Sequence, residues 1–402
     1  MLGPDQYMLG GVRGAFVITG GRIATPDRVL DDGWLAVTNG RIAGVGSGTP
    51  PGDGTVEQID VGGALVVPGF IDTHCHGGGG ASFTSLDPDE QLRAVHAHRR
   101  HGTTTTLASL VSDPVDTITE QVAALRELVQ DGEIAGIHLE GPFISKARCG
   151  AHDPETLIEP DTGTVDKLLR AGQGAIRMVT LAPELYGGVK AVRQLTESGV
   201  IAAIGHTDGI EEQLLPAVDA GARVATHLFN GMRPLHHREP GPVGALLDDE
   251  RITIELICDL VHLHPTVVRL AARHAGRDRT VLITDAMSAT DAADGRYTLG
   301  RLEVDVHGGV ATLADNGSLA GSTLTMDNAF RNLVRGAKLG ILDAVHATSR
   351  KPAELLGIAD RTGCLRPGLD ADIVVLDGDL RPLKVSRRGE WVAEVGTATL
   401  KA

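Results

Sequence analysis

One stretch decides how the chain is laid out: Pro68-Gly69-Phe70-Ile71-Asp72-Thr73-His74-Cys75-His76. Its first part is apolar and predicts a buried strand, and it ends in a His-x-His motif. Because successive side chains of a strand point to opposite faces, His74 and His76 share one face and Cys75 takes the other. Two imidazoles on one face at a strand end can bind a metal ion, whereas the simpler interpretation is a pair of polar residues where the strand frays.

Eight apolar runs begin at residue 70, and amphipathic stretches such as 117–130, 190–198 and 210–220 lie between them. The connection 234–249 shows no clear helix. Strand–helix alternation repeated eight times predicts an α/β fold of the parallel (β/α)8 TIM-barrel type. The predicted strands are residues 70–74, 103–111, 134–139, 175–182, 200–205, 223–228, 252–258 and 280–284.

Both ends of the chain predict β structure. Short apolar runs fill residues 15–67 and 371–395, and the Asn39-Gly40 pair is a strong hairpin signal. Each end is short for a domain of its own, so we expect residues 1–67 and 361–402 to pair into one small β-sandwich-like module beside a barrel of residues 68–360. A β-rich excursion at 295–316 and two closing helices at 324–339 and 343–356 complete the prediction.

Composition narrows the class of protein. The chain has 402 residues and a formal net charge of −15, which argues against nucleic acid or an anionic membrane as a partner. Its four cysteines show neither a disulfide framework nor zinc-type CxxC spacing. No apolar run approaches the length of a membrane span, and the N-terminus lacks a secretory pattern. These features predict a cytoplasmic protein, with Met1 or Met8 as its first residue.

Side chains at the carboxyl ends of barrel strands converge on one mouth, where chemistry takes place. A solvated rim residue is the simpler interpretation of any single histidine. A set of six ligand-type residues in register with the predicted barrel favours a metal site instead. The set contains His74 and His76 after the first run, Glu140 after the third, His206 after the fifth, His227 after the sixth and Asp285 after the eighth.

Imidazole and carboxylate ligands with few thiols suit Zn²⁺ best, with Fe, Co, Mn or Cd as alternatives. The six groups exceed what one tetrahedral site needs, so we expect one or two ions per subunit, with two favoured. The carboxylate of Glu140 is expected to bridge them, with the two histidines of the first run on one ion and the later two on the other. Asp285 is the expected general base, because it lies near the metal and can shuttle a proton.

These ligand positions, on eight strands with a split β module, resemble the amidohydrolase superfamily. Local motifs narrow the resemblance to its N-acetylglucosamine-6-phosphate deacetylase family, over essentially the whole chain. The motifs are His138-Leu139-Glu140-Gly141-Pro142-Phe143, Gly205-His206-Thr207, Thr226-His227-Leu228-Phe229-Asn230-Gly231-Met232, Arg238-Glu239-Pro240-Gly241, Thr284-Asp285-Ala286 and Leu319-Ala320-Gly321-Ser322.

The resemblance implies hydrolysis of N-acetylglucosamine-6-phosphate to glucosamine-6-phosphate and acetate by a metal-activated water. It also implies a homodimer in which Arg238 and His262 come from the neighbouring subunit. A phosphate site is implied at Asn230, Gly231, Arg238 and His262, and a guanidinium fork suits phosphate. Sugar- and acetyl-facing positions are implied at Ala151, His152, Asp259, Leu260, Val261, Leu319, Ala320 and Gly321.

Three alternatives stay open. The first is another metal-dependent amidohydrolase acting on a different N-acyl sugar, a cyclic amide or a nucleobase. The absence of a lysine beside Glu140 counts against the many members that bridge their metals with a carboxylated lysine. The second is a non-catalytic descendant of the fold, and the third is a phosphosugar-binding regulator. Neither of these needs Asp285 together with the full ligand set. His138, two residues before Glu140, is expected to fill the barrel or support a ligand.

Overall fold

The computed structural model describes residues 14–52 and 55–392 and divides them into two compact units. One unit comprises residues up to 71, 98–104 and 326 onward, and the other comprises 72–97 and 105–325. The closing helices thus belong to the first unit, together with both chain ends. The domain boundaries expected from the sequence remain a prediction, because compactness does not show which part folds alone.

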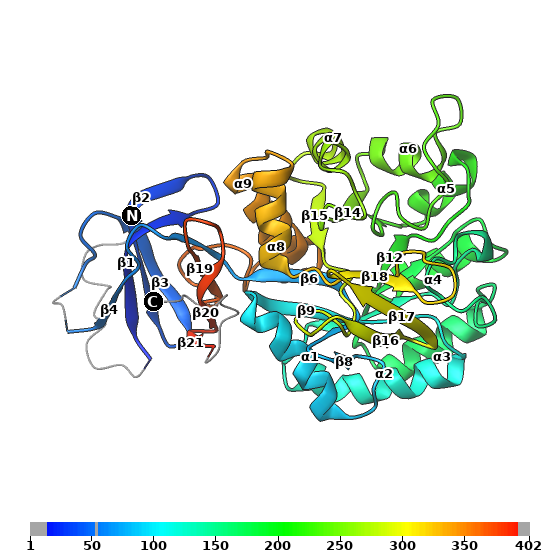
Figure 1. Ribbon diagram of the computed structural model, residues 1–402, viewed down its shortest axis with the longest axis horizontal. Helices are drawn as coiled ribbons and strands as arrows, with labels where there is room; N and C mark the ends of the chain where they lie inside the picture. The colour runs from blue at the N-terminus through cyan, green and yellow to red at the C-terminus, as the bar shows by residue number, and fades with distance from the viewer. Residues whose placement is uncertain (1–13, 53–54, 393–402) are drawn as a thin grey trace. The chain divides into compact units, whose positions relative to one another are not determined.

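The predicted small β module built from both chain ends is confirmed. Its strands form one hydrogen-bonded sheet in the order β21-β20-β19-β5-β1-β2-β3, with β4 paired to β1. Figure 1 shows the blue strands of the N-terminal part beside the red strands of the C-terminal part. The strands are β1 (Phe16–Ala24), β2 (Val29–Thr38), β3 (Arg41–Ser47), β4 (Glu57–Asp60), β5 (Leu65–Pro68), β19 (Ile373–Leu376), β20 (Pro382–Arg387) and β21 (Glu390–Trp391).

Local sequence explains the turn of this sheet and its core. Asn39 and Gly40 both have positive φ, at 50° and 74°, as the tight turn between β2 and β3 requires. Apolar side chains from both chain ends, among them Ile18 and Val375, are fully buried in one cluster. The predicted strand at 391–395 is present at Trp391, and its part beyond residue 392 lies outside the described residues.

The second sheet is the predicted barrel. Its order, β15-β14-β13-β12-β11-β10-β9-β6, runs around the barrel in chain order. Parallel strands covered on both faces need continuous apolar runs, which is why the sequence predicted all eight. The ring is completed where Cys75 bridges Ala286 and the Asp285 N–H donates to the His74 carbonyl. The strands are β6 (Phe70–Cys75), β9 (Thr103–Leu110), β10 (Gly136–Glu140), β11 (Ile176–Leu181), β12 (Ile201–Ile204), β13 (Val224–Ala225), β14 (Thr253–Ile257) and β15 (Thr280–Ile283).

Helices connect the barrel strands, and they confirm most of the predicted amphipathic stretches (Figure 1). Asp161 illustrates how one begins, because its carboxylate caps the N–H groups of Gly163 and Thr164. The connecting helices are α1 (Pro88–Arg100), α2 (Val115–Gln130), α3 (Thr162–Gly172), α4 (Gly188–Glu197), α5 (Glu211–Asp219), α6 (Gly241–Asp248) and α7 (Pro265–Ala275). Three further helices, α8 (Met326–Arg331), α9 (Ile341–Val345) and α10 (Lys351–Leu355), follow the last barrel strand.

Helix α6 corrects the expectation that 234–249 lacks a helix. Its first residues, Gly241 and Pro242, and the internal Gly244 have low helix propensity and hid it. Proline is tolerated in the first turn, and Val243 and Leu246 are buried, so packing stabilises the helix. The predicted closing helices are present in the first unit, where π-helical turns Asn332–Gly336 and His346–Arg350 interrupt them.

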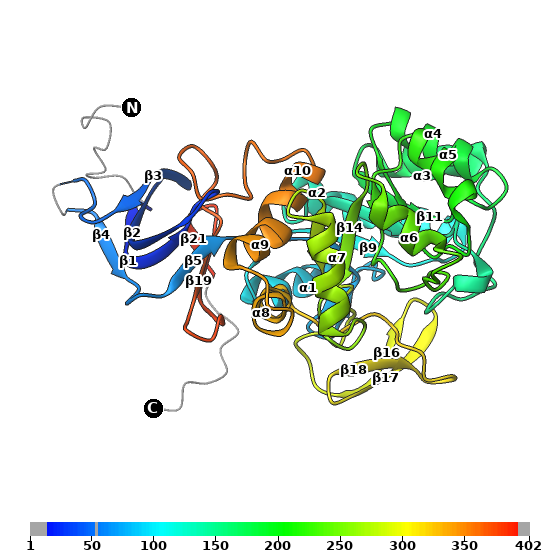
Figure 2. The same ribbon diagram turned by 90° about the horizontal axis from the view of Figure 1, so that it is seen from above.

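The predicted β-rich excursion is an antiparallel three-stranded sheet, which Figure 2 shows apart from the barrel strands. It contains β16 (Gly295–Leu299), β17 (Leu302–His307) and β18 (Val310–Leu313). A short pair, β7 (Gly77–Gly78) and β8 (Ala81–Ser82), and a 3-10 turn, Lys146–Arg148, lie in barrel loops. Among the described residues, no helix is long and apolar enough to cross a membrane.

Candidate metal centre

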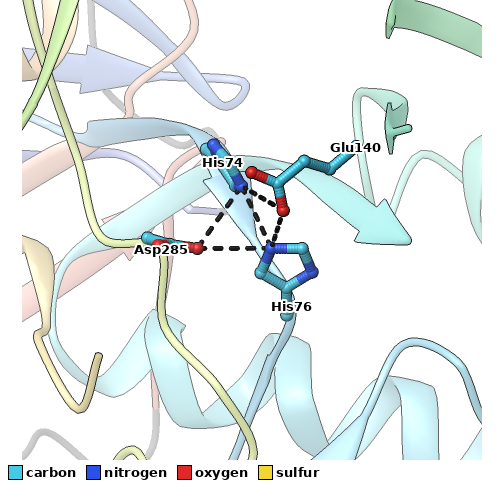
Figure 3. A group of neighbouring side chains, drawn as sticks. All are labelled: His74, His76, Glu140 and Asp285. Atoms are coloured by element: carbon cyan, nitrogen blue, oxygen red, sulfur yellow. Dashed lines mark hydrogen bonds and ion pairs between the residues drawn. The ribbon is translucent and has the colours of Figure 1, made fainter. Parts of the chain in front are cut away.

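Four of the predicted ligands meet at the carboxyl end of the barrel (Figure 3). His74 lies at the end of β6 and His76 directly follows that strand, and their Nε2 atoms lie 3.0 Å apart. Glu140 closes β10, and its Oε2 lies 3.5 Å from His74 Nε2 and 3.2 Å from His76 Nε2. Asp285 follows β15, and its Oδ1 lies 3.4 and 3.2 Å from the same two nitrogens. All four residues are buried, so no water reaches these atoms through the core to form hydrogen bonds with them.

The other two predicted ligands meet the second oxygen of the same carboxylate. Glu140 Oε1 lies 3.1 Å from His206 Nε2 and 2.8 Å from His227 Nε2. The two histidine nitrogens are 3.1 Å apart. Glu140 therefore presents one oxygen to each pair of histidines, which is the arrangement that a bridging carboxylate between two ions requires.

The spacing fits a divalent metal ion. Ligand atoms about 2.0–2.1 Å from a tetrahedral ion are about 3.3–3.4 Å from one another. The distances from the two histidine nitrogens to each other and to the two carboxylate oxygens range from 3.0 to 3.5 Å (Figure 3). Two imidazole nitrogens and two carboxylate oxygens this close repel one another unless a cation lies between them. The residues present therefore fit a metal ion of the Zn²⁺ type.

Hydrogen bonds orient two of the rings for this purpose. His76 Nδ1 lies 3.2 Å from the Ser109 carbonyl, and His206 Nδ1 lies 2.7 Å from the Arg148 carbonyl. A carbonyl oxygen only accepts, so each Nδ1 carries the hydrogen and donates it. The Nε2 lone pair of each ring then faces the centre, as a metal ligand needs.

The electrostatics of the centre favour bound positive charge. Burial alone would lower the pKa of His74, but Glu140 and Asp285 raise it well above its usual value. Burial would conversely raise the pKa of Asp285, but His74 and His76 hold it below the usual range. The carboxylates thus remain ionised while the imidazoles attract a cation, either a proton or a metal ion.

His152 faces the same carboxylate of Glu140, but in a different protonation state from His74. Its Nε2 lies 3.3 Å from Glu140 Oε2, while its Nδ1 accepts a hydrogen bond of 3.2 Å from the Ser112 backbone N–H. Burial lowers the pKa of His152 to about 4, so the ring is neutral and its hydrogen is on Nε2. His152 therefore presents an N–H to the pocket. It suits a substrate oxygen better than a metal ion.

Positive φ angles aim three of these side chains. His206, His227 and Asp285 follow β12, β13 and β15 with φ of 48°, 29° and 50°. Each such conformation costs on the order of 1 kcal/mol or more for a residue with a Cβ, and clusters of them are typical of functional sites.

The His138 ring is held by two hydrogen bonds. Its ring nitrogens bond the hydroxyl groups of Ser109 and Thr180. It fills the barrel, as expected, and has no nitrogen free for a metal.

Two buried carboxylates near the centre escaped the sequence prediction. Asp72 accepts hydrogen bonds from the His74 backbone N–H and from both the backbone and the hydroxyl of Thr284. It thereby ties β6 to the residue before Asp285. Glu255, on β14, lies behind His74. The available signal for both was a charged residue inside an otherwise apolar strand run.

A pocket opens beside the centre. Its empty volume is about 580 Å³, which includes the space open to solvent at its mouth. It brings together many of the residues that the family resemblance implied for the substrate, and it adds Leu299 and Gly150, which the sequence did not suggest. The implied residues that line it are Ala151, His152, Asn230, Gly231, His262, Leu319 and Gly321.

The remaining implied substrate residues lie elsewhere. Asp259 lies behind His262, with its Oδ2 2.7 Å from the ring Nδ1. Ala320 is fully buried in the apolar cluster that includes side chains of the three-stranded sheet. Val261 is half exposed and Leu260 has a positive φ of 66°, and neither lines the pocket.

Arg238 and His262, both implied as contributions from a neighbouring subunit, differ in position. Arg238 is exposed, does not line the pocket, and has its nearest side-chain partner in the adjacent His237. His262 lines the pocket of its own chain together with Asp285. The expectation that it also serves a neighbouring subunit stays a prediction. Sequence position alone could not separate a loop that turns inward from one that turns outward.

Comparison with known proteins gives consistent results. The amidohydrolase family matches residues 65–397. An N-acetylgalactosamine-6-phosphate deacetylase of Escherichia coli O157:H7 is 38% identical over 378 residues, which are 93% of this chain and 98% of that protein. An N-acetylglucosamine-6-phosphate deacetylase of Bacillus subtilis (strain 168) is 35% identical over 381 residues, 91% of this chain and 94% of that protein.

A solved structure is more similar still in sequence. It is a mutant N-acetyl-D-glucosamine-6-phosphate deacetylase of Mycobacterium smegmatis in complex with N-acetyl-D-glucosamine-6-phosphate. It is 45% identical, has a TM-score of 0.91, and covers 94% of this chain and 99% of its own. Agreement of sequence and backbone over nearly the whole length shows that this chain belongs to the amidohydrolase family, whose members are metal-dependent hydrolases.

Proposed function

We propose that this chain hydrolyses the N-acetyl group of N-acetylglucosamine-6-phosphate, giving glucosamine-6-phosphate and acetate. The observation that carries the proposal is the carboxylate of Glu140, which presents one oxygen to each of two histidine pairs at the floor of a pocket. The names of the relatives supply the substrate.

Two ions are proposed, one held by His74, His76, Glu140 and Asp285 and the other by Glu140, His206 and His227. Zn²⁺ suits these donors, and other divalent ions of similar size are alternatives. When bound, such ions supply Lewis acidity, which polarises a carbonyl and makes water more acidic.

The protein's own groups bind the substrate and move its protons. Asp285 is ionised and lines the pocket, so its carboxylate can take a proton from the attacking water and pass it to the leaving nitrogen. The Nε2–H of His152 points to the same region and can donate to the acetyl oxygen as negative charge develops there. Acid–base and oxyanion roles thus fall to two different side chains.

His262 is suited to the phosphate. Its ring donates to Asp259, which also accepts the His262 backbone N–H. Burial alone would lower the pKa of His262, but the bond with Asp259 raises it, which favours the charged ring. A positively charged N–H beside Asn230 and Gly231 in the pocket wall is a donor for a phosphate oxygen.

The direct test is acetate release from N-acetylglucosamine-6-phosphate. We expect activity in protein loaded with Zn²⁺ and its loss after treatment with a chelator, with recovery when the metal is restored. His206→Ala should lower both metal content and activity, because it removes one of three donors of the second ion. Activity that persists in protein shown by mass spectrometry to be metal-free would overturn the proposal.

A second substrate has one specific observation in its favour. The Escherichia coli relative is named for the galactosamine epimer, which differs from the glucosamine sugar only in the configuration at C4. Acetate release should therefore be compared for the two 6-phosphates, and we expect the glucosamine sugar to be preferred, since it is the one bound in the structure of the 45% identical relative.

We further propose a homodimer in which Arg238 completes the phosphate site of the neighbouring subunit. Arg238 is exposed in a loop that also exposes the apolar side chain of Leu235. A guanidinium that does not reach its own pocket needs another target if it binds phosphate. Twofold dimers are the commonest soluble homo-oligomers, so each subunit would give and receive one such contact.

Mixing two inactive variants tests this arrangement. Arg238→Ala and Asp285→Asn are each expected to be inactive alone. In a mixed dimer, the Arg238→Ala subunit keeps its own Asp285 and receives an intact Arg238 from its partner. With random subunit exchange, recovery should approach about a quarter of wild-type activity by twofold symmetry. Confirmed exchange without any recovery would show that Arg238 does not act across an interface.

A further inference from the structure

A buried carboxylate that the proposed chemistry does not use lies behind the metal centre. Glu255 is on β14, and its side chain is fully buried. Its Oε1 accepts a hydrogen bond of 2.8 Å from the Thr73 hydroxyl. Its Oε2 has no hydrogen-bond partner. A buried carboxylate oxygen without a donor is costly, so a partner for this atom is to be expected.

The atom that faces this oxygen is also without a hydrogen bond. His74 Nδ1 is fully buried, has no hydrogen-bond partner, and lies 3.8 Å from Glu255 Oε2. The other ring nitrogen, Nε2, points toward the carboxylates of the centre (Figure 3). An imidazole that binds metal through Nε2 carries its hydrogen on Nδ1 and usually donates it to an oxygen.

We propose that Glu255 is a positioning residue for His74. Its Oε2 accepts the Nδ1–H of His74, which holds the ring in the tautomer whose Nε2 lone pair faces the ion. Thr73 holds the carboxylate in place through the opposite oxygen. This inference rests on the proposed metal centre and concerns the ion on the His74 side alone.

The pairing distinguishes His74 from the other oriented ligands. His76 and His206 donate their Nδ1–H to neutral backbone carbonyls, of Ser109 and Arg148. In the described part of the chain, His74 is the one proposed ligand histidine whose Nδ1 faces a side-chain carboxylate. A carboxylate partner makes an imidazole a stronger ligand, so Glu255 should raise the affinity of the His74-side ion selectively.

The experiment measures zinc affinity rather than activity. Wild type, Glu255→Gln, Glu255→Leu and His74→Ala are equilibrated with chelator-buffered Zn²⁺, and bound metal per chain is determined. We expect Glu255→Gln to weaken the His74-side ion by about 10–100-fold, the usual effect of losing such a partner, and Glu255→Leu to weaken it at least as much. The ion on the His206 side should keep its affinity.

Two further variants separate positioning from a general structural role. Glu184 makes a similar carboxylate–threonine bond, of 2.6 Å to Thr207, but has no unpartnered ligand nitrogen facing it. Glu184→Gln should therefore leave the affinity of the His74-side ion unchanged. Adding Glu255→Gln to His74→Ala should cause no further loss of metal, because Glu255 acts through the His74 ring. An additional loss in the double variant would contradict the inference.

The outcomes also separate this inference from the proposed function. If wild type binds no divalent ion, the metal centre itself fails and the inference with it. If wild type binds metal and releases acetate while Glu255→Gln and Glu255→Leu bind metal with unchanged affinity, only the positioning role fails. Circular dichroism of the metal-free variants is used to check that they are folded. If Glu255→Leu does not fold, the isosteric Glu255→Gln variant decides the question.

Discussion

Asp285→Asn is expected to lower kcat for N-acetylglucosamine-6-phosphate by about 10²–10⁴-fold, the usual contribution of a general acid–base group. The amide has the shape of the carboxylate and keeps an oxygen toward the centre, so metal should remain bound. It cannot take a proton from water or return one to the leaving nitrogen. Although burial alone would raise the pKa of Asp285, His74 and His76 lower it and keep the wild-type group ionised, and the substitution removes that charge.

The measurement is kcat at saturating metal, with metal content determined on the same samples. Asp315→Asn is a matched control, because it makes the same chemical change at an exposed position. It should leave both quantities unchanged. An Asp285→Asn variant that keeps its metal and full turnover would exclude Asp285 as the proton-transfer group.

Removal of the phosphate from the substrate should lower kcat/KM by a factor similar to the loss of kcat expected for Asp285→Asn. We expect kcat/KM for N-acetylglucosamine to be about 10²–10⁴-fold below that for its 6-phosphate. The loss of two charge-assisted hydrogen bonds, about 1.5–3 kcal/mol each, gives this range. His262, which lines the pocket, is the proposed donor from the same chain, and Arg238 is the proposed donor from the neighbour.

A substitution in the pocket shows where the discrimination arises. His262→Gln should lower kcat/KM for the phosphorylated sugar and leave the low value for the plain sugar unchanged, because only the former meets this side chain. Equal kcat/KM values for the two sugars in wild type would contradict the phosphate pocket. They would favour an amidohydrolase of another N-acyl sugar or a cyclic amide.

The barrel could be predicted because its strands are short apolar runs. Strands of a parallel sheet are covered on both faces, so runs such as 252–258 stand out from the amphipathic stretches between them. Helix α6 could not be predicted in this way. Its glycines and Pro242 oppose a helix locally, and burial of Val243 and Leu246 stabilises it only once the barrel is formed.

The candidate ligands could be predicted from the same runs, since a residue just after a barrel strand lies at the mouth. His206 and Asp285 follow from this rule. The direction of a loop does not follow from this rule. His262 turns into its own pocket, whereas Arg238 remains at the surface, and both lie in connections without regular structure.

By itself, the sequence determined the eight barrel strands, the split β module and the identity of six ligand-type residues. Only the tertiary structure decided which atoms meet: that Glu140 divides its two oxygens between two pairs of histidines, and that His152 presents an N–H. It also decided the place of Glu255, whose bond to Thr73 joins residues 182 positions apart. Such contacts depend on barrel closure and side-chain rotamers, which act across strands and leave no periodic pattern along the chain.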